Sequence, residues 1–218
     1  MLKLIRVALF VTVLGAILFA SAGRWNVPGF WAYLVVAGLV GAFAVFTIDD
    51  PALVRERRRP GPGGIDGGLR FFAAPLLAVH FIVAGVDVGR YAWSRPPALA
   101  LQAAALVGCG ASLAVTFWAM ALNRFFSSVV RLQTERGHHV ITAGPYRMVR
   151  HPGHLGMTSA FTLSGIALGS WWSILPALIY VGLVLRRTVI EDRFLLEKLA
   201  GYRDYAATVR WRLLPLVW

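Results

Sequence analysis

The 218-residue chain is 58% apolar and only 15% charged, with a mean hydropathy of +0.65, so it carries more apolar surface than a soluble core of this size can bury. These values predict a membrane protein and exclude an ordinary soluble domain. A net charge of +12 does not predict a nucleic-acid partner, because the basic residues flank long apolar segments and form no continuous basic face. The single cysteine, Cys109, excludes an internal disulfide and a cysteine-based zinc site.

The first part of the chain contains two apolar segments, residues 7–23 and 25–48, which carry no charged residue. Because an α-helix rises about 1.5 Å per residue, each segment can cross a hydrocarbon core of about 30 Å. An alternative for the first segment is a signal peptide, since Ala20-Ser21-Ala22 resembles a cleavage site. We interpret it as a membrane span because further spans follow it.

Residues 49–70 are predicted to form a polar loop. They contain Asp49-Asp50-Pro51, the basic run Arg55–Arg59 and the glycine- and proline-rich Pro60–Gly64. We interpret the basic run as a determinant of membrane topology, with a lipid-headgroup site as the alternative.

The third and fourth spans are predicted at residues 71–88 and 97–122. The turn Ser94-Arg95-Pro96-Pro97 joins them into a helical hairpin. Asp87 lies at the end of the third span, and we expect it to pair with Arg90 at the membrane interface; the alternative is a buried functional acid.

Polarity returns in residues 123–153, which are not predicted to cross the membrane. The next segment, 155–185, is uncharged and is too long for one straight span, so it predicts two shortish helices, or one full and one half, in a hairpin. The tail, 186–218, alternates charged and aromatic residues, with helical periodicity over 191–200. We expect this tail to lie on the membrane surface.

Together these segments predict an all-α polytopic membrane protein with about five to six transmembrane helices. We divide it into a four-helix transmembrane region, residues 1–122, and a catalytic region, residues 123–218, with the helical hairpin and the surface-lying tail. All of the 22 Lys and Arg except Arg24, Arg90 and Arg95 fall on one side of the membrane if the N-terminus is cytoplasmic. The positive-inside rule therefore places both termini and the polar C-terminal third in the cytoplasm, at the cell inner membrane.

The densest polar cluster runs from Gly144 to Gly156 and reads GPYRMVRHPGHLG. Its Arg150-His151-Pro152, preceded by Gly144 and Tyr146 and followed by Gly156, resembles the signature of the isoprenylcysteine carboxyl methyltransferase family. Related phospholipid methyltransferases share this signature. The likeness covers about residues 123–215, and the first four spans are similar only in kind.

Segments on both sides of this cluster extend the resemblance. Asn123-Arg124-Phe125-Phe126 precedes it, and Arg187-Thr188, Glu191-Asp192 and Gly201-Tyr202 follow it. The resemblance implies a membrane methyltransferase that uses S-adenosylmethionine as its cofactor.

The residue types suit that cofactor, which carries a sulfonium cation, an amino-acid end, ribose hydroxyls and adenine. Arginine and histidine can bind the carboxylate, and the backbone of an extended strip can bind adenine. The resemblance implies that the cofactor is lined by Gln133, His139, Val140, Ile141, Tyr146, His151, Pro152, Gly153, His154 and Glu191. It also implies that Arg187, one helical turn before Glu191, faces the substrate, and that these two residues act in catalysis.

The sequence departs from the family pattern at two positions. His154 stands where the family has tyrosine, and Asp192 stands where the acid pair normally has its second glutamate. The first change affects an expected cofactor contact, although an imidazole can also stack and form hydrogen bonds. The second only shortens an acid.

Each motif also has a plain structural interpretation. Arg150–Pro152 can be a juxtamembrane basic patch whose side chains reach lipid phosphates. Glu191 and Asp192 can be charges on a helix surface that pair with Arg187 and Arg193. The adjacent His138 and His139 have no second ligand pair at metal-binding spacing, so no metal site is predicted.

These observations favour an S-adenosylmethionine-dependent membrane methyltransferase whose acceptor is a lipophilic small molecule, a lipid-modified substrate or a membrane lipid. The residues do not choose between an isoprenylcysteine-like carboxylate and a lipid headgroup. A second hypothesis is an NADPH-dependent reductase, because membrane sterol reductases resemble the same C-terminal motif. A third is a non-enzymatic scaffold or small transporter, although the first four spans provide no charged pathway for an ion.

Overall fold

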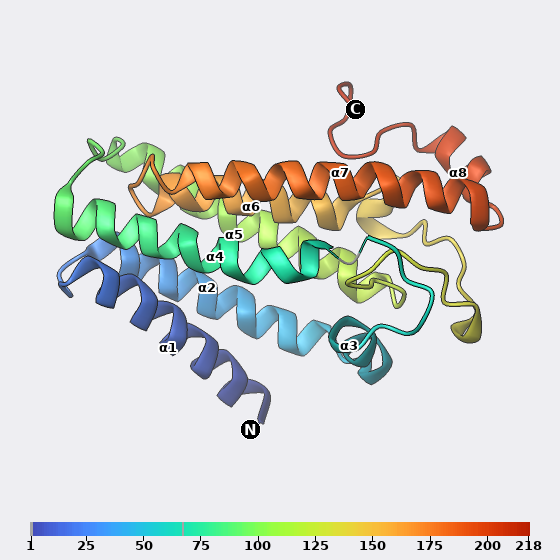
Figure 1. Cartoon of the computed structure of the whole chain (residues 1–218), viewed down its shortest axis with the longest axis horizontal. Coiled ribbons are helices and arrows are strands. Elements are labelled where there is room, and N and C mark those ends of the chain that lie inside the picture. Colours follow the sequence, from blue (N-terminus) through green and yellow to red (C-terminus); the bar gives the residue numbers. More distant parts are fainter. Residues whose placement is uncertain (1, 67) are drawn as a thin grey trace.

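Six long helices run side by side in the computed structural model, which describes residues 2–66 and 68–218 (Figure 1). They are α1 (Leu2–Ala22), α2 (Pro28–Thr47), α4 (Gly68–Gly85), α5 (Leu99–Leu122), α6 (Pro152–Ala167) and α7 (Ile174–Lys198). A π-helix, Val86–Tyr91, continues α4, and the short α-helices are α3 (Pro51–Arg58) and α8 (Tyr202–Thr208). Two 3-10 helices, Thr134–Arg136 and Gly144–Arg147, lie between α5 and α6. The described residues contain no β-strand, so the all-α prediction is confirmed.

Four helical segments are long and apolar enough to cross a membrane: Leu2–Ala22, Pro28–Thr47, Phe71–Tyr91 and Leu99–Leu122. They coincide with the four predicted spans, and the third is longer than predicted because the π-helix extends it to Tyr91. The apolar stretch 155–185 forms the predicted hairpin, made of α6 and the first half of α7. Gly169 lies in the turn of this hairpin at a φ of +85°, a conformation that favours glycine.

The predicted polar loop 49–70 contains a helix, α3, which the sequence analysis missed. Asp50 caps it, since its Oδ1 accepts a hydrogen bond from the Ala52 N–H at 2.8 Å, and Pro51 occupies the first helical position. Arg55, Arg57 and Arg58 of the predicted loop therefore lie in a helix, and Arg59 lies at its end. Their side chains point in different directions around the helix axis.

The C-terminal tail also differs from the prediction. Residues 186–198 do not form a separate segment along the membrane surface, because α7 continues without a break to Lys198 in line with its apolar half (Figure 1). The position of the rest of the tail at the membrane surface stays a prediction.

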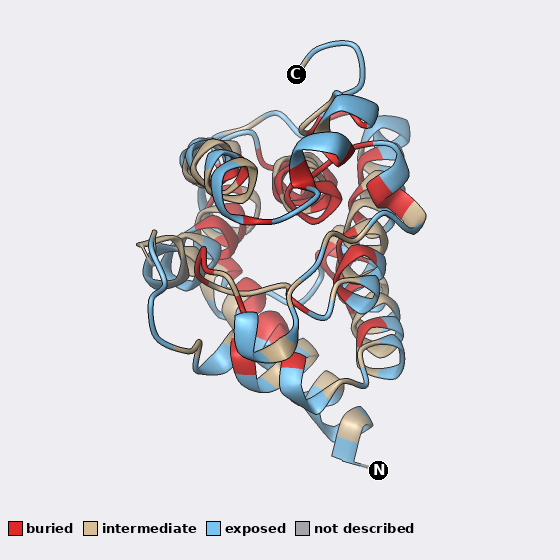
Figure 2. Cartoon of the chain, turned by 90° about the vertical axis from the view of Figure 1, so that its right-hand side faces the viewer, coloured by how far each residue is buried: buried red, intermediate tan, exposed pale blue. Residues whose placement is uncertain are grey.

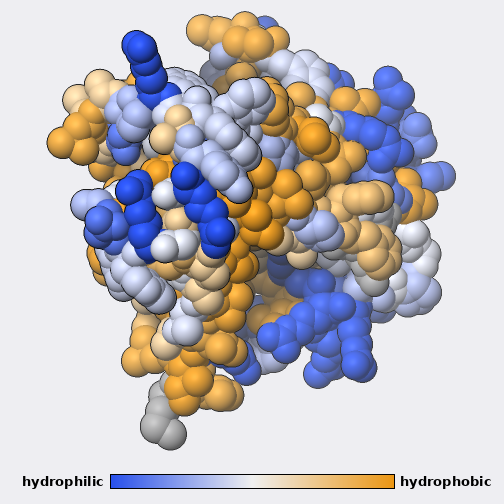
Figure 3. All heavy atoms as spheres, turned by 60° about the vertical axis from the view of Figure 1, so that its left-hand side comes forward, coloured by the Kyte–Doolittle hydropathy of each residue, from blue (hydrophilic) through white to orange (hydrophobic). Residues whose placement is uncertain are grey.

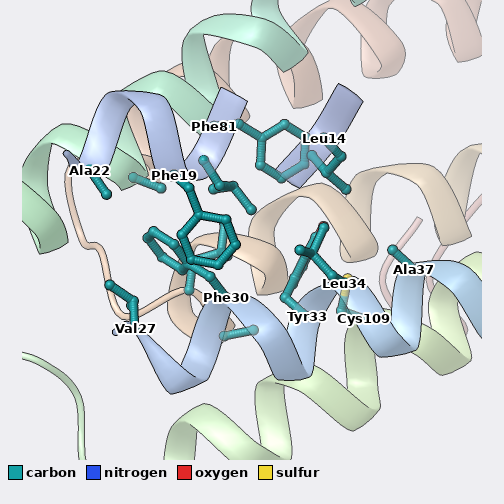
Figure 4. Packing of buried hydrophobic residues seen from close by; sticks show 14 of the residues in the cluster. Leu14, Phe19, Ala22, Val27, Phe30, Tyr33, Leu34, Ala37, Phe81 and Cys109 are labelled. Atoms are coloured by element: carbon teal, nitrogen blue, oxygen red, sulfur yellow. The ribbon is translucent and has the colours of Figure 1, made fainter. Parts of the chain in front are cut away.

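Inner faces of the helices form the main core, and apolar outer faces remain exposed (Figure 2). Leu18 of α1 and Phe30 of α2 are completely buried and belong to a cluster that includes Phe81 of α4 and Cys109 of α5 (Figure 4). The cluster joins elements that are distant in sequence.

The outer surface is rich in apolar side chains. On the face shown in Figure 3 they lie between separate clusters of hydrophilic residues. Leu39 of α2 is 67% exposed and Val107 of α5 is 72% exposed. Apolar side chains on the outside of long helices are the arrangement that lipid requires.

The polar segments gather at one end of the helix bundle. The start of α1, the whole of α3, the largely irregular segment 123–143 and α8 all lie toward this end, whereas the turns that follow α1, the π-helix and α6 lie at the other (Figure 1). The fold therefore brings the polar residues of the C-terminal third together.

Candidate active site

A cavity lies at the polar end of the bundle, where the segment 123–143, the start of α6, the end of α7 and α8 meet. All of its lining residues come from the predicted catalytic region, between Asn123 and Tyr205. The predicted site residues among them are His139, Val140, Ile141, Tyr146, His151, Gly153, His154 and Glu191. Gln133, Pro152 and Arg187 do not line this cavity.

The cavity volume is about 70 Å³. Pockets that enclose small molecules usually measure roughly 300–1,000 Å³. Side chains along the wall, such as the half-buried Phe126, must therefore move outward when a cofactor-sized molecule binds.

Two glycines of the signature allow its close packing. A Cβ on Gly153 would lie 2.5 Å from the Phe126 ring, and a Cβ on Gly156 would collide with the Ser112 carbonyl and the Thr116 hydroxyl of α5. The signature therefore uses glycine where α6 meets the cavity wall and where it packs against α5.

Asp192 is a completely buried acceptor that holds the signature in place. Its carboxylate accepts two hydrogen bonds from Arg150, at 2.8 and 3.0 Å, one from Arg212 at 2.7 Å and one from the Tyr202 hydroxyl at 3.0 Å. The His151 Nε2 lies 3.2 Å from the same carboxylate. Burial favours the protonated acid, but these donors together hold the pKa of Asp192 far below its usual value.

The structure contradicts the lipid-phosphate interpretation of Arg150 and the helix-surface interpretation of Asp192, whereas Glu191 does pair with Arg187, at 3.4 Å. Arg150 is buried and bound to Asp192, so it does not extend toward lipid phosphates. Asp192 is equally buried, and its partners are Arg150 and Arg212, so it is not a helix-surface charge.

Glu191, the neighbour of Asp192, faces the cavity. Its carboxylate lies 3.4 Å from the Arg187 Nε, 3.9 Å from the His151 Nδ1 and 3.9 Å from the His154 Nε2. Burial favours the protonated form of Glu191, but His154, Arg187 and His151 outweigh it and lower the pKa. Glu191 is therefore a charged carboxylate on the cavity wall.

His154, which stands in place of the family tyrosine, lies parallel to His151. The ring centroids are 5.4 Å apart and the ring planes differ by 6°. Burial lowers the pKa of His154 to about 3, so the ring is neutral. The Thr188 hydroxyl donates to the Val184 carbonyl, which leaves it to accept a hydrogen bond from the His154 Nδ1 at 2.9 Å. The lone pair of Nε2 therefore remains available beside Glu191.

The strip His139–Ile141 has no regular secondary structure and lines the cavity. No hydrogen bond between described residues uses the backbone N–H or C=O groups of Val140 or Ile141. These groups need partners, and a bound molecule can supply them.

Tyr146 is buried in the wall and fixed by three interactions. Its hydroxyl accepts from the Asn123 side chain at 3.1 Å and lies 3.4 Å from the Ala119 carbonyl, while its own carbonyl accepts from the Tyr205 hydroxyl at 2.7 Å. Tyr146 thus links α5, the signature and α8.

The remaining predicted residues lie behind the wall. Gln133 is completely buried, and its amide donates to the Phe125 carbonyl at 2.7 Å and accepts from Arg136 at 2.6 Å. Arg187 is 3% exposed and donates to the carbonyls of Ser128, at 2.8 Å, and Ser127, at 3.1 Å. Pro152 starts α6.

Sequence reasoning missed two features of the site. One is the binding of Asp192 by Arg150, Tyr202 and Arg212, which no local pattern reveals. The other is α3, which the Glu56–Arg131 ion pair attaches to the segment 123–143. The Asp50-Pro51 sequence at the start of α3 is a helix-start signal that could have found it.

Among the residues that the structure describes, no three His, Cys, Asp or Glu side chains form a metal-binding group.

A comparison with curated proteins found no match for this sequence. The family model described as phospholipid methyltransferase matches residues 88–200, which is more than half of the chain and includes the signature, Arg187 and Glu191. The chain therefore belongs to the phospholipid methyltransferase family, a family of membrane methyltransferases related to the isoprenylcysteine carboxyl methyltransferases that its signature resembles.

Proposed function

We propose that this protein is an integral membrane enzyme that transfers a methyl group from S-adenosylmethionine to a lipophilic acceptor. The observation that carries the proposal is the group formed by Glu191, His151 and His154 on the cavity wall. A charged carboxylate beside the lone pair of the His154 Nε2 is suited to a cation, and both the sulfonium and the α-ammonium of this cofactor are cationic.

Other lining residues of the cavity suit the adenine end of the cofactor. The unpaired backbone groups of Val140 and Ile141 can donate to and accept from the edge of the base, and Phe126, another lining residue, offers a ring face. A cationic end and a heterocyclic end would then be bound by different residues of one cavity.

S-adenosylmethionine, when bound, supplies a methyl carbon activated by the sulfonium. The chain has little covalent work to do, because that carbon is already electrophilic. Glu191 compensates the positive charge, and the rigid hydrogen bonds of Asp192 hold His151 in position, so that cofactor and acceptor are aligned. The resemblance implies that Arg187, bound beside Glu191, acts on the acceptor.

A second cavity, of about 420 Å³, supports a lipophilic acceptor. It lies between α1, α2, α4, α5, α6 and α7, and apolar side chains form most of its wall. Met157 of α6 and Tyr180 of α7 line it, and the Tyr180 hydroxyl lies 3.6 Å from the Met157 sulfur. A hydrocarbon chain is the chemical group that such a wall accepts.

We propose that both termini and the polar end of the bundle lie in the cytoplasm, as the distribution of Lys and Arg predicts. In that orientation the first cavity would be open to a water-soluble cofactor and the second to a lipid from the bilayer. We therefore propose the inner membrane as the location, with the active site facing the cytoplasm.

Calorimetric titration of the detergent-purified protein with S-adenosylhomocysteine tests the proposal. We expect micromolar binding by the wild type and an affinity lower by a factor on the order of ten or more for Glu191→Gln, because a charge-assisted contact is lost. Glu197→Gln is the matched control, since Glu197 is an exposed residue of the same helix. It should bind as the wild type does.

Failure of the wild type to bind S-adenosylhomocysteine would contradict the proposal. If NADPH bound instead, the reductase hypothesis would replace it. A loss of affinity in Glu197→Gln equal to that in Glu191→Gln would show that the effect is not specific to the cavity.

A further inference from the structure

His80 of α4 is completely buried inside the helix bundle, and both of its ring nitrogens have polar partners. The Nδ1 lies 2.8 Å from the carbonyl of Ser173, in the turn between α6 and α7, and the Nε2 lies 2.6 Å from the hydroxyl of Ser164 on α6. Polar side chains inside a membrane-spanning bundle are costly and often belong to a functional site. This group lies far from the cofactor cavity, so the proposed function does not account for it.

The partners of His80 decide which groups donate. A carbonyl only accepts, so the Nδ1 carries the hydrogen and donates it to Ser173. No carboxylate of residues 2–66 or 68–218 pairs with His80, and an uncompensated charge is unstable in such a place, so the ring is neutral. The Ser164 hydroxyl therefore donates to the Nε2, because two acceptors do not lie 2.6 Å apart without a hydrogen between them.

The turn that carries the Ser173 carbonyl is held by further hydrogen bonds. The Ser173 N–H donates to the Ser170 hydroxyl oxygen at 3.2 Å, and the Ser170 hydroxyl donates to the Asp87 carboxylate at 2.6 Å. All three residues are completely buried. The carbonyl is therefore fixed, and it fixes the orientation of His80 and, through His80, the direction in which Ser164 donates.

Ser164 lies in the wall of the apolar cavity of about 420 Å³, as do Tyr33 of α2 and Phe81 of α4. The Phe81 ring centroid is 5.8 Å from that of Tyr33 and 5.0 Å from that of His80, so the aromatic ring connects the two polar side chains (Figure 4). On α6, α2 and α4 these three are the lining residues farthest from the polar end of the bundle. The polar group therefore closes the inner end of an otherwise largely apolar cavity.

This end of the cavity offers more acceptors than donors. The Ser164 hydrogen is used by His80, and the Ser164 oxygen keeps both of its lone pairs. The Tyr33 hydroxyl adds one donor and further lone pairs, and the Cys109 thiol, another lining group, is only a weak donor. A ligand group that donates a hydrogen bond satisfies these acceptors, whereas an ether or ketone oxygen leaves them unpaired.

A cationic donor does not fit the same place. An ammonium group would donate hydrogen bonds, but no Asp or Glu of the described residues lines this cavity. Its charge would remain uncompensated among apolar side chains, which is far more costly than burying a neutral group. A hydroxyl is neutral and both donates and accepts, so it can donate to Ser164 and accept from Tyr33.

We propose that the inner end of the apolar cavity binds the hydroxyl group of a lipophilic alcohol through Ser164 and Tyr33. Ser164 and His154 lie on the same helix, α6, and a rise of about 1.5 Å per residue separates them by about 15 Å along its axis. The inference rests on the proposed function for the identity of the occupant. The methyl acceptor is then a lipid that carries a hydroxyl group at the end away from the methylated group.

Three molecules of the same size test the hydroxyl requirement: octanol, its isomer methyl heptyl ether, and nonane. Binding to the purified full-length protein is measured by equilibrium dialysis without cofactor, with the same detergent on both sides, so that partition into micelles cancels. We expect octanol to bind on the order of fivefold more tightly than the ether, because only octanol donates a hydrogen bond. Equal affinities for octanol and the ether would overturn the inference.

Ser164→Val replaces the hydroxyl by a methyl group that also covers the His80 Nε2. It should reduce the octanol preference over the ether to within about twofold and leave the nonane affinity within about twofold of the wild type, which a general loss of packing would not do. Tyr33→Phe, which removes only an oxygen atom, should lower the same preference by a smaller factor.

Ser159→Val is the matched control, since Ser159 is half-buried on the same helix and does not line the cavity. It should keep the octanol preference. A preference that persists in both Ser164→Val and Tyr33→Phe would also overturn the inference. Titration with S-adenosylhomocysteine separates the two proposals: a wild type that prefers octanol but binds no S-adenosylhomocysteine retains the hydroxyl site and loses the proposed function.

Discussion

The Asp192 carboxylate accepts hydrogen bonds from residues in three separate parts of the chain. Arg150 belongs to the signature, Tyr202 to α8 and Arg212 to the C-terminal segment. Because the donors lower its pKa far below the usual value, Asp192 stays charged at physiological pH. The buried Asp192 carboxylate thus compensates the positive charges of both Arg150 and Arg212.

Asp192→Asn should destabilise the protein by about 3–5 kcal/mol, because the substitution leaves the buried Arg150 guanidinium without compensation. It should also weaken S-adenosylhomocysteine binding, since His151 loses its fixed acceptor. Chemical unfolding followed by circular dichroism measures the first effect and calorimetry the second. Glu197→Gln is again the control, and equal stability of Asp192→Asn and wild type would show that the carboxylate is not the organising group.

Glu191 and Asp192 are adjacent in the sequence but have different roles. Successive residues of a helix point about 100° apart, so Glu191 faces the cavity while Asp192 faces the signature. The resemblance indicated a cofactor contact for Glu191, and its place in the cavity wall agrees with this. The role of Asp192 was not predictable, because it depends on an arginine that is 42 residues away in sequence.

At the level of elements, the contact between α5 and α6 positions the signature. Gly156 lies where the α6 backbone meets Ser112 and Thr116 of α5. Since α6 begins at Pro152, any shift of this helix moves His151 and His154 with it.

Gly156→Ala and Gly182→Ala are the same chemical change in two membrane helices, but they should have opposite outcomes. The new methyl group at position 156 collides with α5, which should cost about 1–3 kcal/mol and lower cofactor affinity. A Cβ at position 182 meets nothing within 4 Å, and alanine favours a helix, so stability should be unchanged or slightly higher. Thermal unfolding of both variants measures the difference; equal loss would contradict the packing argument.

Two elements show where the sequence prediction was incomplete near the polar end: the helix α3 was missed, and the end of α7 was predicted to be a separate segment. The sequence of α3 is short and rich in arginine, so it has no apolar stripe, and only the Asp50-Pro51 start indicates a helix. The second half of α7 is charged, which suggested a separate surface segment. Its Arg187, Thr188 and Asp192 are nevertheless buried, because their partners come from the loops of the site.

At the level of the whole molecule, the spans were predictable and the site was predictable only in part. A lipid environment requires long apolar segments, and hydropathy alone locates them. The segment 123–143 has almost no regular structure, so its path depends on single contacts such as Gln133 to Phe125 and Arg131 to Glu56. The family resemblance predicted that this segment lines the cofactor site, whereas its pattern of apolar residues gave no such indication.

Two of the three arginines at the other end of the bundle, Arg24 and Arg90, have structural partners. Arg90 donates to the carbonyls of Ser21, at 2.6 Å, and Ala20, at 3.0 Å, which lie at the C-terminal end of α1. Arg24 donates to the Val88 carbonyl at 2.8 Å. These two arginines therefore stabilise helix ends, and their presence does not weaken the charge asymmetry on which the orientation rests.

Single-cysteine labelling tests that orientation. Cys109 is 2% exposed, so it gives a low background, and Pro96→Cys and Thr208→Cys place exposed thiols at opposite ends of the bundle. A membrane-impermeant maleimide should label Pro96→Cys in intact cells and Thr208→Cys only after the membrane is permeabilised. The reverse pattern would place the cofactor cavity outside the cytoplasm, where S-adenosylmethionine would have to be supplied across the membrane, and the positive-inside argument would then be wrong for this chain.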